Sequence, residues 1–301
     1  MPTLRSLGET GLIARIGRRL PKDRTVAVGI GDDAAVLRPP RGELLFASDM
    51  LIEGVHFLRG RMPASRIGWK ALAVNVSDIA AMGGVPRWAV VSIGLPPSTP
   101  VRFVDGLYAG LARCARRFHV SIVGGDTNRA PKVVIDVAIL GTVAPGRAVL
   151  RSGIRSGDAL FVTGRLGGSY RSGRHMAFTP RLREAQELLR RVDVRAMIDL
   201  SDGLASDLWQ LSRASRCVLR VEAGCVPVAR SAGSVYHALT DGEDFELLFA
   251  VGGRAASRVP RRLGRCPVTR IGTAVRRGVG VELRRPDGRI VRLPPRGFRH
   301  F

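Results

Sequence analysis

Aspartates that follow apolar, β-rich runs are the residues of this chain with the clearest chemical potential. In each case a run such as "LLFAS", "SIVGG" or "AMI" ends and a carboxylate comes directly after it. Because neighbouring strands of an α/β sheet end at a shared crevice, these side chains are expected to converge on one ligand site. The pattern recurs at Asp32, Asp33, Asp49, Asp126, Asp199 and Asp202.

These carboxylates need a compensating charge, because a buried unpaired carboxylate costs several kcal/mol even after relaxation. Asp78 adds to the need, since it lies one turn beyond Val74 on or beside an apolar helix face. Apart from Lys70, two turns earlier, no lysine or arginine is near the aspartates of the first half at helical pairing distance. A site of oxygen donors without histidine or cysteine clusters favours Mg²⁺, and such sites usually also hold phosphates.

Each aspartate taken alone has a second interpretation as a turn former or a helix N-cap. Asp202 in particular could cap a helix through Leu204 and Leu208. The glycines in "GIGDD", "GGDT" and "SDG" favour a ligand site, because glycine lets the backbone approach a ligand closely. The glycine-rich "TGRLGGS" at residues 163–169 is a weak phosphate signal and more often a turn, and no G-x-x-x-x-G-K-[ST] motif occurs.

Composition limits the function classes. The net charge of +23 raises nucleic acid as a partner, but only three lysines occur and the arginines are scattered in pairs. A basic nucleic-acid-binding protein would leave the aspartate pattern unexplained, so we expect no nucleic-acid partner.

No run approaches the roughly 20 apolar residues of a membrane span, and no signal peptide is evident. Four cysteines without C-x-x-C spacing indicate reduced thiols, and we expect a cytoplasmic protein with no membrane partner.

The pattern of elements predicts two domains in the 301 residues. Apolar β-rich runs alternate with helical patterns over residues 65–82 and 100–118, then restart after Pro145-Gly146 with a strand at "ALFVTG". A helix over 179–192 and a strand feeding a helix at "AMIDLSDGLASDLWQLSRAS" follow. We place the domains at residues 1–145 and 146–301, and the Arg- and Gly-rich part from residue 254 is the least readable.

Seven motifs together resemble those of the thiamine-monophosphate kinases, in the same order and at about the same spacing. They are "GIGDDAAVL", "SDMLIEGVHF", "KALAVNVSDIAAMGG", "GGDTNRA", "RSGIRSGDALFVTG", "IDLSDGLASDL" and "TDGEDFELLF". The resemblance implies an α/β (α+β) fold of two domains, like that of aminoimidazole-ribonucleotide synthetase. It also implies a homodimer in which two N-terminal domains build a barrel. The region 164–185 is shorter than in many members of the family.

The resemblance implies a reaction and a set of residues for it. The reaction is ATP plus thiamine monophosphate giving ADP and thiamine diphosphate, with several Mg²⁺ ions. The implied metal ligands are Asp33, Ser48, Asp49, Asp78, Asp126, Asp199 and Asp202. The implied ATP contacts are Gly125, Asp126, Arg151 and Ser201, and the implied thiamine phosphate contacts are His56, Glu243 and Phe298. Asp49, Asp126 and Arg151 are expected to act on the transferring phosphoryl group.

The implied reaction requires few catalytic groups beyond these residues. The attacking phosphate oxygen is already anionic, so catalysis consists of aligning two phosphates and neutralising their repulsion, with no phosphoenzyme expected. His56 and Phe298 could equally be packed structural residues. Aminoimidazole-ribonucleotide synthetase and the hydrogenase-maturation enzymes of the superfamily remain alternatives on fold, but they lack this set of motifs. Selenophosphate synthetase would be expected to carry a reactive cysteine or selenocysteine in an N-terminal segment rich in glycine and lysine. It is disfavoured, because the first cysteine of this chain is Cys114, within a predicted helix.

Overall fold

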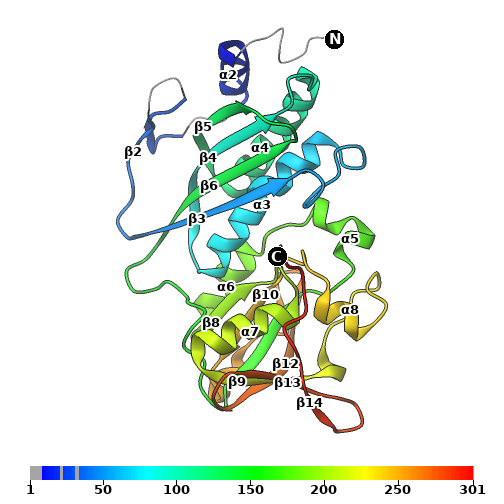
Figure 1. Cartoon of the computed structure of the whole chain (residues 1–301). Coiled ribbons are helices and arrows are strands. Elements are labelled where there is room, and N and C mark those ends of the chain that lie inside the picture. Colours follow the sequence, from blue (N-terminus) through cyan, green and yellow to red (C-terminus); the bar gives the residue numbers. More distant parts are fainter. Residues whose placement is uncertain (1–8, 21–22, 31–33, 301) are drawn as a thin grey trace. The chain divides into compact units, whose positions relative to one another are not determined.

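The computed structural model describes residues 9–20, 23–30 and 34–300, and it divides the chain into two compact units (Figure 1). The first unit comprises Met1–Ile79 and Gly84–Gly146, and the second comprises Ala80–Gly83 and Arg147–Phe301. The end of one helix therefore belongs to the second unit although the rest of that helix belongs to the first. Among the described residues, no helix is both long enough and apolar enough to cross a bilayer.

A four-stranded sheet forms the centre of the first unit. Its order is β3-β6-β4-β5, with β4 and β5 parallel and the other pairs antiparallel. One face carries buried apolar residues such as Ile135, Val137 and Ile139 of β6, which alternate with half-buried or exposed neighbours. The strands are β3 (Glu43–Ile52), β4 (Val85–Leu95), β5 (Ser121–Arg129) and β6 (Val134–Val143), with a short β1 (Val26–Val28) and β2 (Val36–Leu37) pair outside the sheet.

Two long helices, α3 (Ala64–Ala81) and α4 (Val101–Phe118), lie on one side of this sheet (Figure 1). Glycines let them approach closely, since a Cβ at Gly68 would lie 1.9 Å from the carbonyl oxygen of Leu107. A Cβ at Gly110 would lie 2.0 Å from the carbonyl oxygen of Ser65. The predicted stop of α3 at Gly83 is confirmed, where the φ angle of +73° suits glycine. A further helix, α2 (Glu9–Gly17), was not predicted.

The second unit contains a larger mixed sheet of order β14-β13-β9-β12-β7-β10-β8, with β11 paired to β12. The Arg- and Gly-rich C-terminal part supplies four of its strands, which the sequence pattern indicated only as short strand-like pieces. The strands are β7 (Ala159–Thr163), β8 (Val194–Asp199), β9 (Cys217–Glu222), β10 (Leu247–Val251), β11 (Arg262–Leu263), β12 (Cys266–Arg277), β13 (Gly280–Arg284) and β14 (Ile290–Arg292).

Helices cover both faces of the central strands of this sheet. Leu160 and Val162 of β7 belong to one core with α7, whereas Phe161 of β7 belongs to another with α6. Strands buried on both faces lack the polar alternation of a half-exposed strand, as the continuous run "ALFVT" shows. The helices are α6 (Leu182–Arg191), α7 (Leu204–Ser215), α5 (Ser169–Ser172) and α8 (Val235–Thr240), with 3₁₀ helices η1 (Arg174–Met176), η2 (Ala223–Cys225) and η3 (Gly253–Arg258).

The mixed α/β architecture confirms the predicted fold class, but two predicted strand ends are wrong. Asp49 is the seventh residue of the ten-residue β3, and Asp126 lies inside β5, which continues to Arg129. Each strand continues because its neighbour continues to pair with it, up to the pairs Ile52 with Val134 and Leu95 with Arg129. Among the predicted strand-end aspartates that the structure describes, Asp199 alone, as the last residue of β8, ends its strand.

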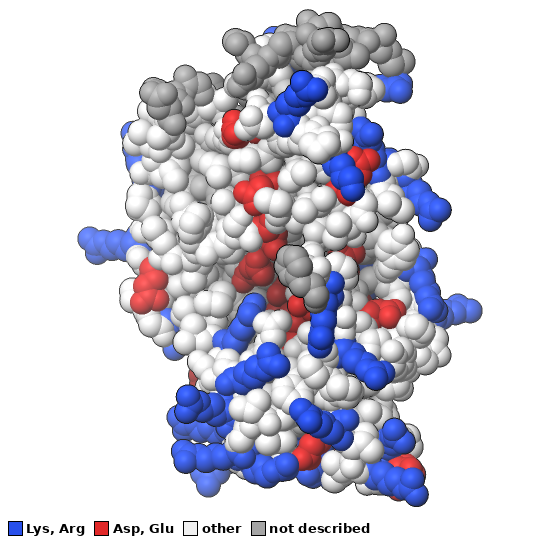
Figure 2. Space-filling view, in the orientation of Figure 1, with Lys and Arg blue, Asp and Glu red and all other residues white. Residues whose placement is uncertain are grey.

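The sequence predicts scattered basic side chains and cysteines that are not paired with each other. Arginine and lysine side chains are spread over the visible face of the second unit, at the bottom of Figure 2, without forming one continuous patch. All four cysteines are free, and three of them are buried.

Candidate functional site

On β3, Ser48 and Asp49 are sequence neighbours and therefore point to opposite faces of the sheet. The Ser48 hydroxyl lies on the face away from the helices and donates to Asp136 Oδ1 at 3.0 Å. The Asp49 side chain lies on the face covered by α3 and α4, where its register neighbour Val137 is buried. Asp78 is half-buried on α3, one of the two helices that cover this face.

Asp136 is a carboxylate that the sequence reasoning missed. It lies within the apolar strand "VIDVAIL" and faces Met50 of β3 on one side and Ser92 of β4 on the other. Ser92 in turn faces Asp126 of β5, so one row across the sheet holds two carboxylates with a serine between them. The signal for it was a single charged residue in an alternating strand, which marks a polar position on the uncovered face.

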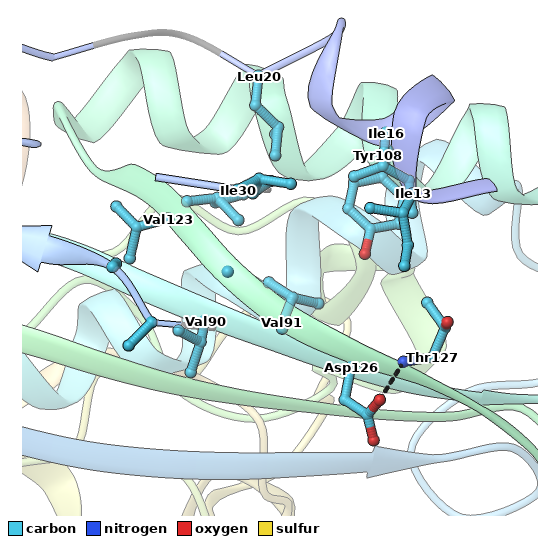
Figure 3. Close-up of a pocket in the computed structure, with 15 residues that line it drawn as sticks. Ile13, Ile16, Leu20, Ile30, Val90, Val91, Tyr108, Val123, Asp126 and Thr127 are labelled. Carbon is cyan, nitrogen blue, oxygen red and sulfur yellow. Dashed lines mark hydrogen bonds between the residues drawn. The ribbon is translucent and has the colours of Figure 1, made fainter. Parts of the chain in front are cut away.

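Gly125 and Asp126 line a cavity of about 850 Å³ in the first unit (Figure 3). Most of the residues that line it are apolar, Ile13, Val91 and Val123 among them, and Asp126 lies at one edge. Asp126 Oδ1 accepts the N–H of Thr127 at 2.8 Å, and its other oxygen accepts from the Asn128 side chain. Apolar walls with a few polar groups at one edge are typical of a small-molecule site.

Gly125 cannot be replaced by a larger residue without a shift of the backbone. Its φ angle is +152°, and a Cβ there would lie 1.9 Å from the carbonyl oxygen of Val91. The predicted pair Asp32 and Asp33 lies outside the described residues. Ile30 and Ala34, which flank that stretch in the sequence, both line the same cavity.

His56 lies in the turn after β3 and has the hydrogen bonds of a packed residue. Its Nδ1 accepts the backbone N–H of Ile52 at 3.0 Å, and its carbonyl oxygen accepts from Lys70 Nζ at 2.9 Å. Lys70 is completely buried on α3. The nearest lysine in sequence to Asp78 therefore holds the His56 turn in place, and the imidazole is fixed by its own Nδ1 contact.

In the second unit, two loops that carry predicted site residues are hydrogen-bonded to each other. β8 ends at Asp199, the loop after it contains Ser201 and Asp202, and the loop before β10 contains Glu243. The N–H of Glu243 donates to the carbonyl oxygen of Ser201 at 2.7 Å. The chain tail joins them, since the N–H of Phe298 donates to the carbonyl oxygen of Asp202 at 3.0 Å. Four predicted contacts are thereby brought to one edge of the second sheet.

Asp202 does not cap the following helix, so that alternative interpretation is wrong. The N-cap of α7 is Gly203, whose φ angle of 114° suits glycine and which has no side chain to cap the helix. Arg151 lies nearby and donates to the Gln210 side chain at 2.6 Å. Burial raises the pKa of Asp202, although the charges of His300 and Arg151 oppose the shift.

Asp207 is a second carboxylate that the sequence reasoning missed. It is completely buried, its Oδ1 accepts from Gln210 Nε2 at 3.1 Å, and its Oδ2 has no hydrogen-bond partner among the described residues. Burial, followed by repulsion from Asp199 and Asp202, raises the pKa of this carboxyl well above its ordinary value. The signal was its place in the first turn of the helix in "SDGLASD", five residues after Asp202.

The oxygen chemistry of this edge suits a divalent cation, because a cation would relieve the repulsion among the three carboxyls and give Asp207 Oδ2 a partner. Among the described residues, no three Asp, Glu, His or Cys side chains are already placed to hold an ion by themselves. Mg²⁺ is commonly held by one or two carboxylates together with substrate phosphates. The donors therefore fit Mg²⁺ that arrives with a nucleotide.

The glycine-rich segment 163–169 bonds to carboxylates of the protein itself. The N–H of Gly167 donates to Asp244 Oδ2 at 2.7 Å, and the N–H of Gly168 donates to Asp241 Oδ2 at 2.9 Å. Both bonds join this segment to the loop that carries Glu243. The weak phosphate signal in the sequence thus corresponds to an internal contact between two loops.

Comparison with known proteins gives the family. The N-terminal domain model of AIR synthase related proteins matches residues 31–143, and the C-terminal domain model matches residues 168–284. The thiamine-monophosphate kinase of Rhodopirellula baltica is 39% identical over 94% of this chain and 93% of its own length. The thiamine-monophosphate kinase of Escherichia coli is 34% identical, over 98% of each chain.

Solved structures agree with this assignment. The thiamine-monophosphate kinase of Stenotrophomonas maltophilia is 31% identical with a TM-score of 0.80, over 92% of this chain and 96% of that one. The structure named "AaThiL complexed with AMPPCP and TMP" is also 31% identical, with a TM-score of 0.77 over 100% of this chain and 99% of that one. Hydrogenase maturation protein HypE, at 22% identity and a TM-score of 0.79, shares the fold. The chain belongs to the thiamine-monophosphate kinase family of AIR synthase related proteins.

Proposed function

We propose that this chain is a thiamine-monophosphate kinase, which transfers the γ-phosphate of ATP to the phosphate of thiamine monophosphate and releases thiamine diphosphate and ADP. Relatives of that name match nearly its whole length, and one related structure is named for its complex with AMPPCP and TMP. The observation that carries the proposal is the bond between Glu243 and Ser201. It joins two motifs, "DLSDG" and "DGEDFE", that the family resemblance connects with the nucleotide and with the acceptor.

The reaction needs no strong base. A phosphate oxygen of thiamine monophosphate attacks the γ-phosphorus in line, the bond from that phosphorus to the β,γ-bridging oxygen breaks, and ADP leaves with that electron pair. Arg151 is near Asp202 and supplies a cation to an edge otherwise rich in carboxylates. Its role is to bind and orient phosphate charge, as arginine does through its planar donors.

For the first unit, the proposed Mg²⁺ ligands are Asp33, Ser48, Asp49, Asp78 and Asp126. For the second unit, they are Asp199 and Asp202. When bound, the ions supply charge neutralisation for the phosphates that approach each other. Asp136 and Asp207 extend this set, since Asp136 accepts from Ser48 and the pKa of Asp207 responds to Asp199 and Asp202. The side chains of Asp126 and Gln210 are oriented by their own hydrogen bonds before any ligand arrives.

Each domain has its own task in this proposal. Residues 1–145 bind metal and ATP and form the dimer, and the cavity beside Gly125 and Asp126 supports a nucleotide base on its apolar wall. Residues 146–301 contribute Arg151, Ser201, Glu243 and Phe298. Free cysteines suit the reducing cytoplasm, where ATP is available, and we propose that compartment.

The homodimer has support from the uncovered face of the first sheet. Leu44, Phe46 and Met50 of β3 and Val90 of β4 are exposed large apolar residues on this face, and Phe46 is 74% exposed. Register puts Val90 opposite Ala138 and Phe46 opposite Leu140, so the apolar strip crosses three strands. The same face also carries Ser48, Asp136 and Asp126, and exposed large apolar side chains gathered on one sheet face favour an interface. A second copy of the same face is self-complementary and closes as a two-fold pair.

A direct assay tests the proposed function. Purified protein is incubated with ATP, Mg²⁺ and thiamine monophosphate, with free thiamine as a parallel acceptor, and the products are resolved by chromatography. Formation of thiamine diphosphate from the monophosphate alone supports the proposal. If no thiamine diphosphate forms although ATP binds in the presence of Mg²⁺, the acceptor is another compound and the proposal is wrong.

A further inference from the structure

The loop that carries Glu243 has a strained backbone. Glu243 has a φ angle of 61° and Phe245 one of 49°, and both are residues with a Cβ in the left-handed region. Such residues persist only where surrounding contacts fix the conformation, and they gather at functional sites. The contacts that fix this loop, residues 241–246, are therefore part of how Glu243 is presented.

One side of the loop is fixed by backbone bonds that continue the pairing of β8 with β10. The N–H of Phe245 donates to the carbonyl oxygen of Leu200 at 2.8 Å, and the N–H of Leu200 donates to the carbonyl oxygen of Glu246 at 2.8 Å. These bonds set the distance of the loop from β8. They leave the opposite side of the loop, where the side chains of Asp244 and Glu246 lie, to be fixed by other groups.

Arg181 fixes that side through Glu246. Glu246 is 1% exposed, and Arg181 binds both of its oxygens, with Nε to Oε2 at 2.7 Å and a terminal nitrogen to Oε1 at 2.6 Å. Thr163 Oγ1 also donates to Oε2, at 2.7 Å, and accepts the N–H of Leu247 at 2.8 Å. A bidentate arginine pair fixes orientation as well as distance, which a lysine at this position could not do.

Arg174 joins Glu246 to Asp244. One terminal nitrogen of Arg174 donates to the carbonyl oxygen of Asp244 and to Glu246 Oε1, and the other donates to the carbonyl oxygen of Arg165 at 2.9 Å. The Asp244 carboxylate accepts from the N–H of Gly167 at 2.7 Å and from the Ser169 hydroxyl at 2.8 Å. Two arginines and the glycine-rich segment thus hold the loop together.

Glycine is required in that segment for the same reason. A Cβ at Gly164, whose φ angle is +65°, would lie 2.2 Å from Glu246 Oε1. The segment therefore passes directly against the Glu246 carboxylate, and there is no room between them for a ligand group. The predicted set of site residues does not include Arg174, Arg181 or Glu246.

We propose that Arg174 and Arg181 are positioning residues for the acceptor, which act through Asp244 and Glu246 to hold the strained loop and so present Glu243 beside Ser201. This inference rests on the proposed function, in which Glu243 lies near thiamine phosphate. Loss of either arginine is expected to raise the KM for thiamine monophosphate more than the KM for ATP. Arg181 holds the loop in position through Glu246 and does not itself touch the reacting atoms.

The test compares two matched arginines of the second unit. Arg181→Gln breaks the pair with Glu246, and Arg220→Gln breaks the pair with Glu282, which also has two bonds, at 2.9 and 2.8 Å. The arginine side chains are 24% and 23% exposed, but Glu246 is 1% and Glu282 is 16% exposed, so Arg181→Gln should lower thermal stability more, and the KM values are compared at a temperature where both variants are folded. We expect Arg181→Gln to raise the KM for thiamine monophosphate about 10- to 50-fold, as for a lost charged hydrogen bond, and Arg220→Gln to leave it within about twofold. Arg181→Lys should fall between Arg181→Gln and the unaltered enzyme.

A double-mutant cycle separates position from general damage. If Arg181 acts through Glu243, then Arg181→Gln adds little to the KM for thiamine monophosphate once Glu243→Gln is present. A full additional effect on that background overturns the inference, as does a KM change equal to that of Arg220→Gln.

If the unaltered protein makes no thiamine diphosphate, the proposed function fails and the loop is followed by hydrogen exchange instead. Faster exchange at residues 241–246 in Arg181→Gln, but not in Arg220→Gln, then supports the positioning role. Unchanged exchange overturns it.

Discussion

The N–H of Glu243 donates to the carbonyl oxygen of Ser201 at 2.7 Å, and this bond joins two loops whose residues are 42 positions apart in sequence. The neighbouring Gly242 makes this approach possible, because a Cβ at that position would lie 2.6 Å from the same carbonyl oxygen. The contact unites the residue expected at the nucleotide with the residue expected at the acceptor. A disturbance of either loop should therefore affect the binding of both substrates.

Replacement of Gly242 tests this contact. Gly242→Ala is expected to push the two loops apart and to lower the free energy of unfolding by about 1–3 kcal/mol, since the new Cβ meets backbone that cannot move without cost. The KM values for both substrates should rise. Urea unfolding and steady-state kinetics measure the two effects. Gly224→Ala is the control, because no atom lies within 4 Å of its Cβ position. An unaltered KM in Gly242→Ala would show that the loops work independently.

The pH dependence of stability should depend on Asp244. Burial raises the pKa of this carboxyl to about 6. Because the folded pKa is above the unfolded value, the group stabilises the fold fully below about pH 4, and that contribution is lost as pH rises through about 6. Asp244→Asn cannot ionise. The unfolding free energy of the variant minus that of the unaltered protein should therefore increase by about 1–3 kcal/mol between pH 4 and 7. A constant difference over that range would contradict the assignment.

Cation binding should depend on Asp207. Asp207→Asn removes one of three repelling carboxyls, so the variant without added metal should be as stable as the unaltered protein or more so. The rise in melting temperature on addition of MgCl₂ with ADP should fall by at least about half, because stabilisation by a ligand follows its affinity. Asp193→Asn, at an exposed aspartate before β8, is the control. An undiminished rise in Asp207→Asn would exclude this carboxyl from the cation site.

Sequence reasoning identified the fold class and the two-domain arrangement of elements because hydrophobic periodicity is a local property. The helix predicted over 65–82 is α3 (Ala64–Ala81), and the helix predicted over 100–118 is α4 (Val101–Phe118). It placed Asp49 and Asp126 at strand ends, and both lie inside strands. Where a strand ends depends on how far its partner continues, and that information lies in another part of the chain.

The missed residues have the same explanation. Asp136 and Asp207 are single acids in otherwise apolar elements, and only the tertiary structure shows that Asp136 accepts from Ser48 and that Asp207 is near Asp199. The Arg181–Glu246 pair joins residues 65 positions apart, and although Glu246 lies in the motif "TDGEDFELLF", nothing in that motif indicates Arg181 as its partner. Pairs of this kind are visible in the structure alone, because long-range hydrogen bonds leave no periodicity.

The uncovered face of the first sheet gives the last prediction, which concerns assembly. Phe46 lies in the strip of exposed apolar residues on that face, and its exposed fraction of 74% is the largest among the exposed apolar side chains of the described chain. If two copies pair through this face, Phe46→Glu places one uncompensated negative charge from each copy in the interface. The dissociation constant of the dimer should then rise by at least about 100-fold, as for loss of a central aromatic contact. Sedimentation equilibrium at micromolar protein measures this change. Tyr236→Glu, at a residue that is also exposed but belongs to the second unit, should leave the dimer intact. If Phe46→Glu and the unaltered protein have the same mass in solution, the sheet face is not the dimer interface, and its apolar strip needs another partner.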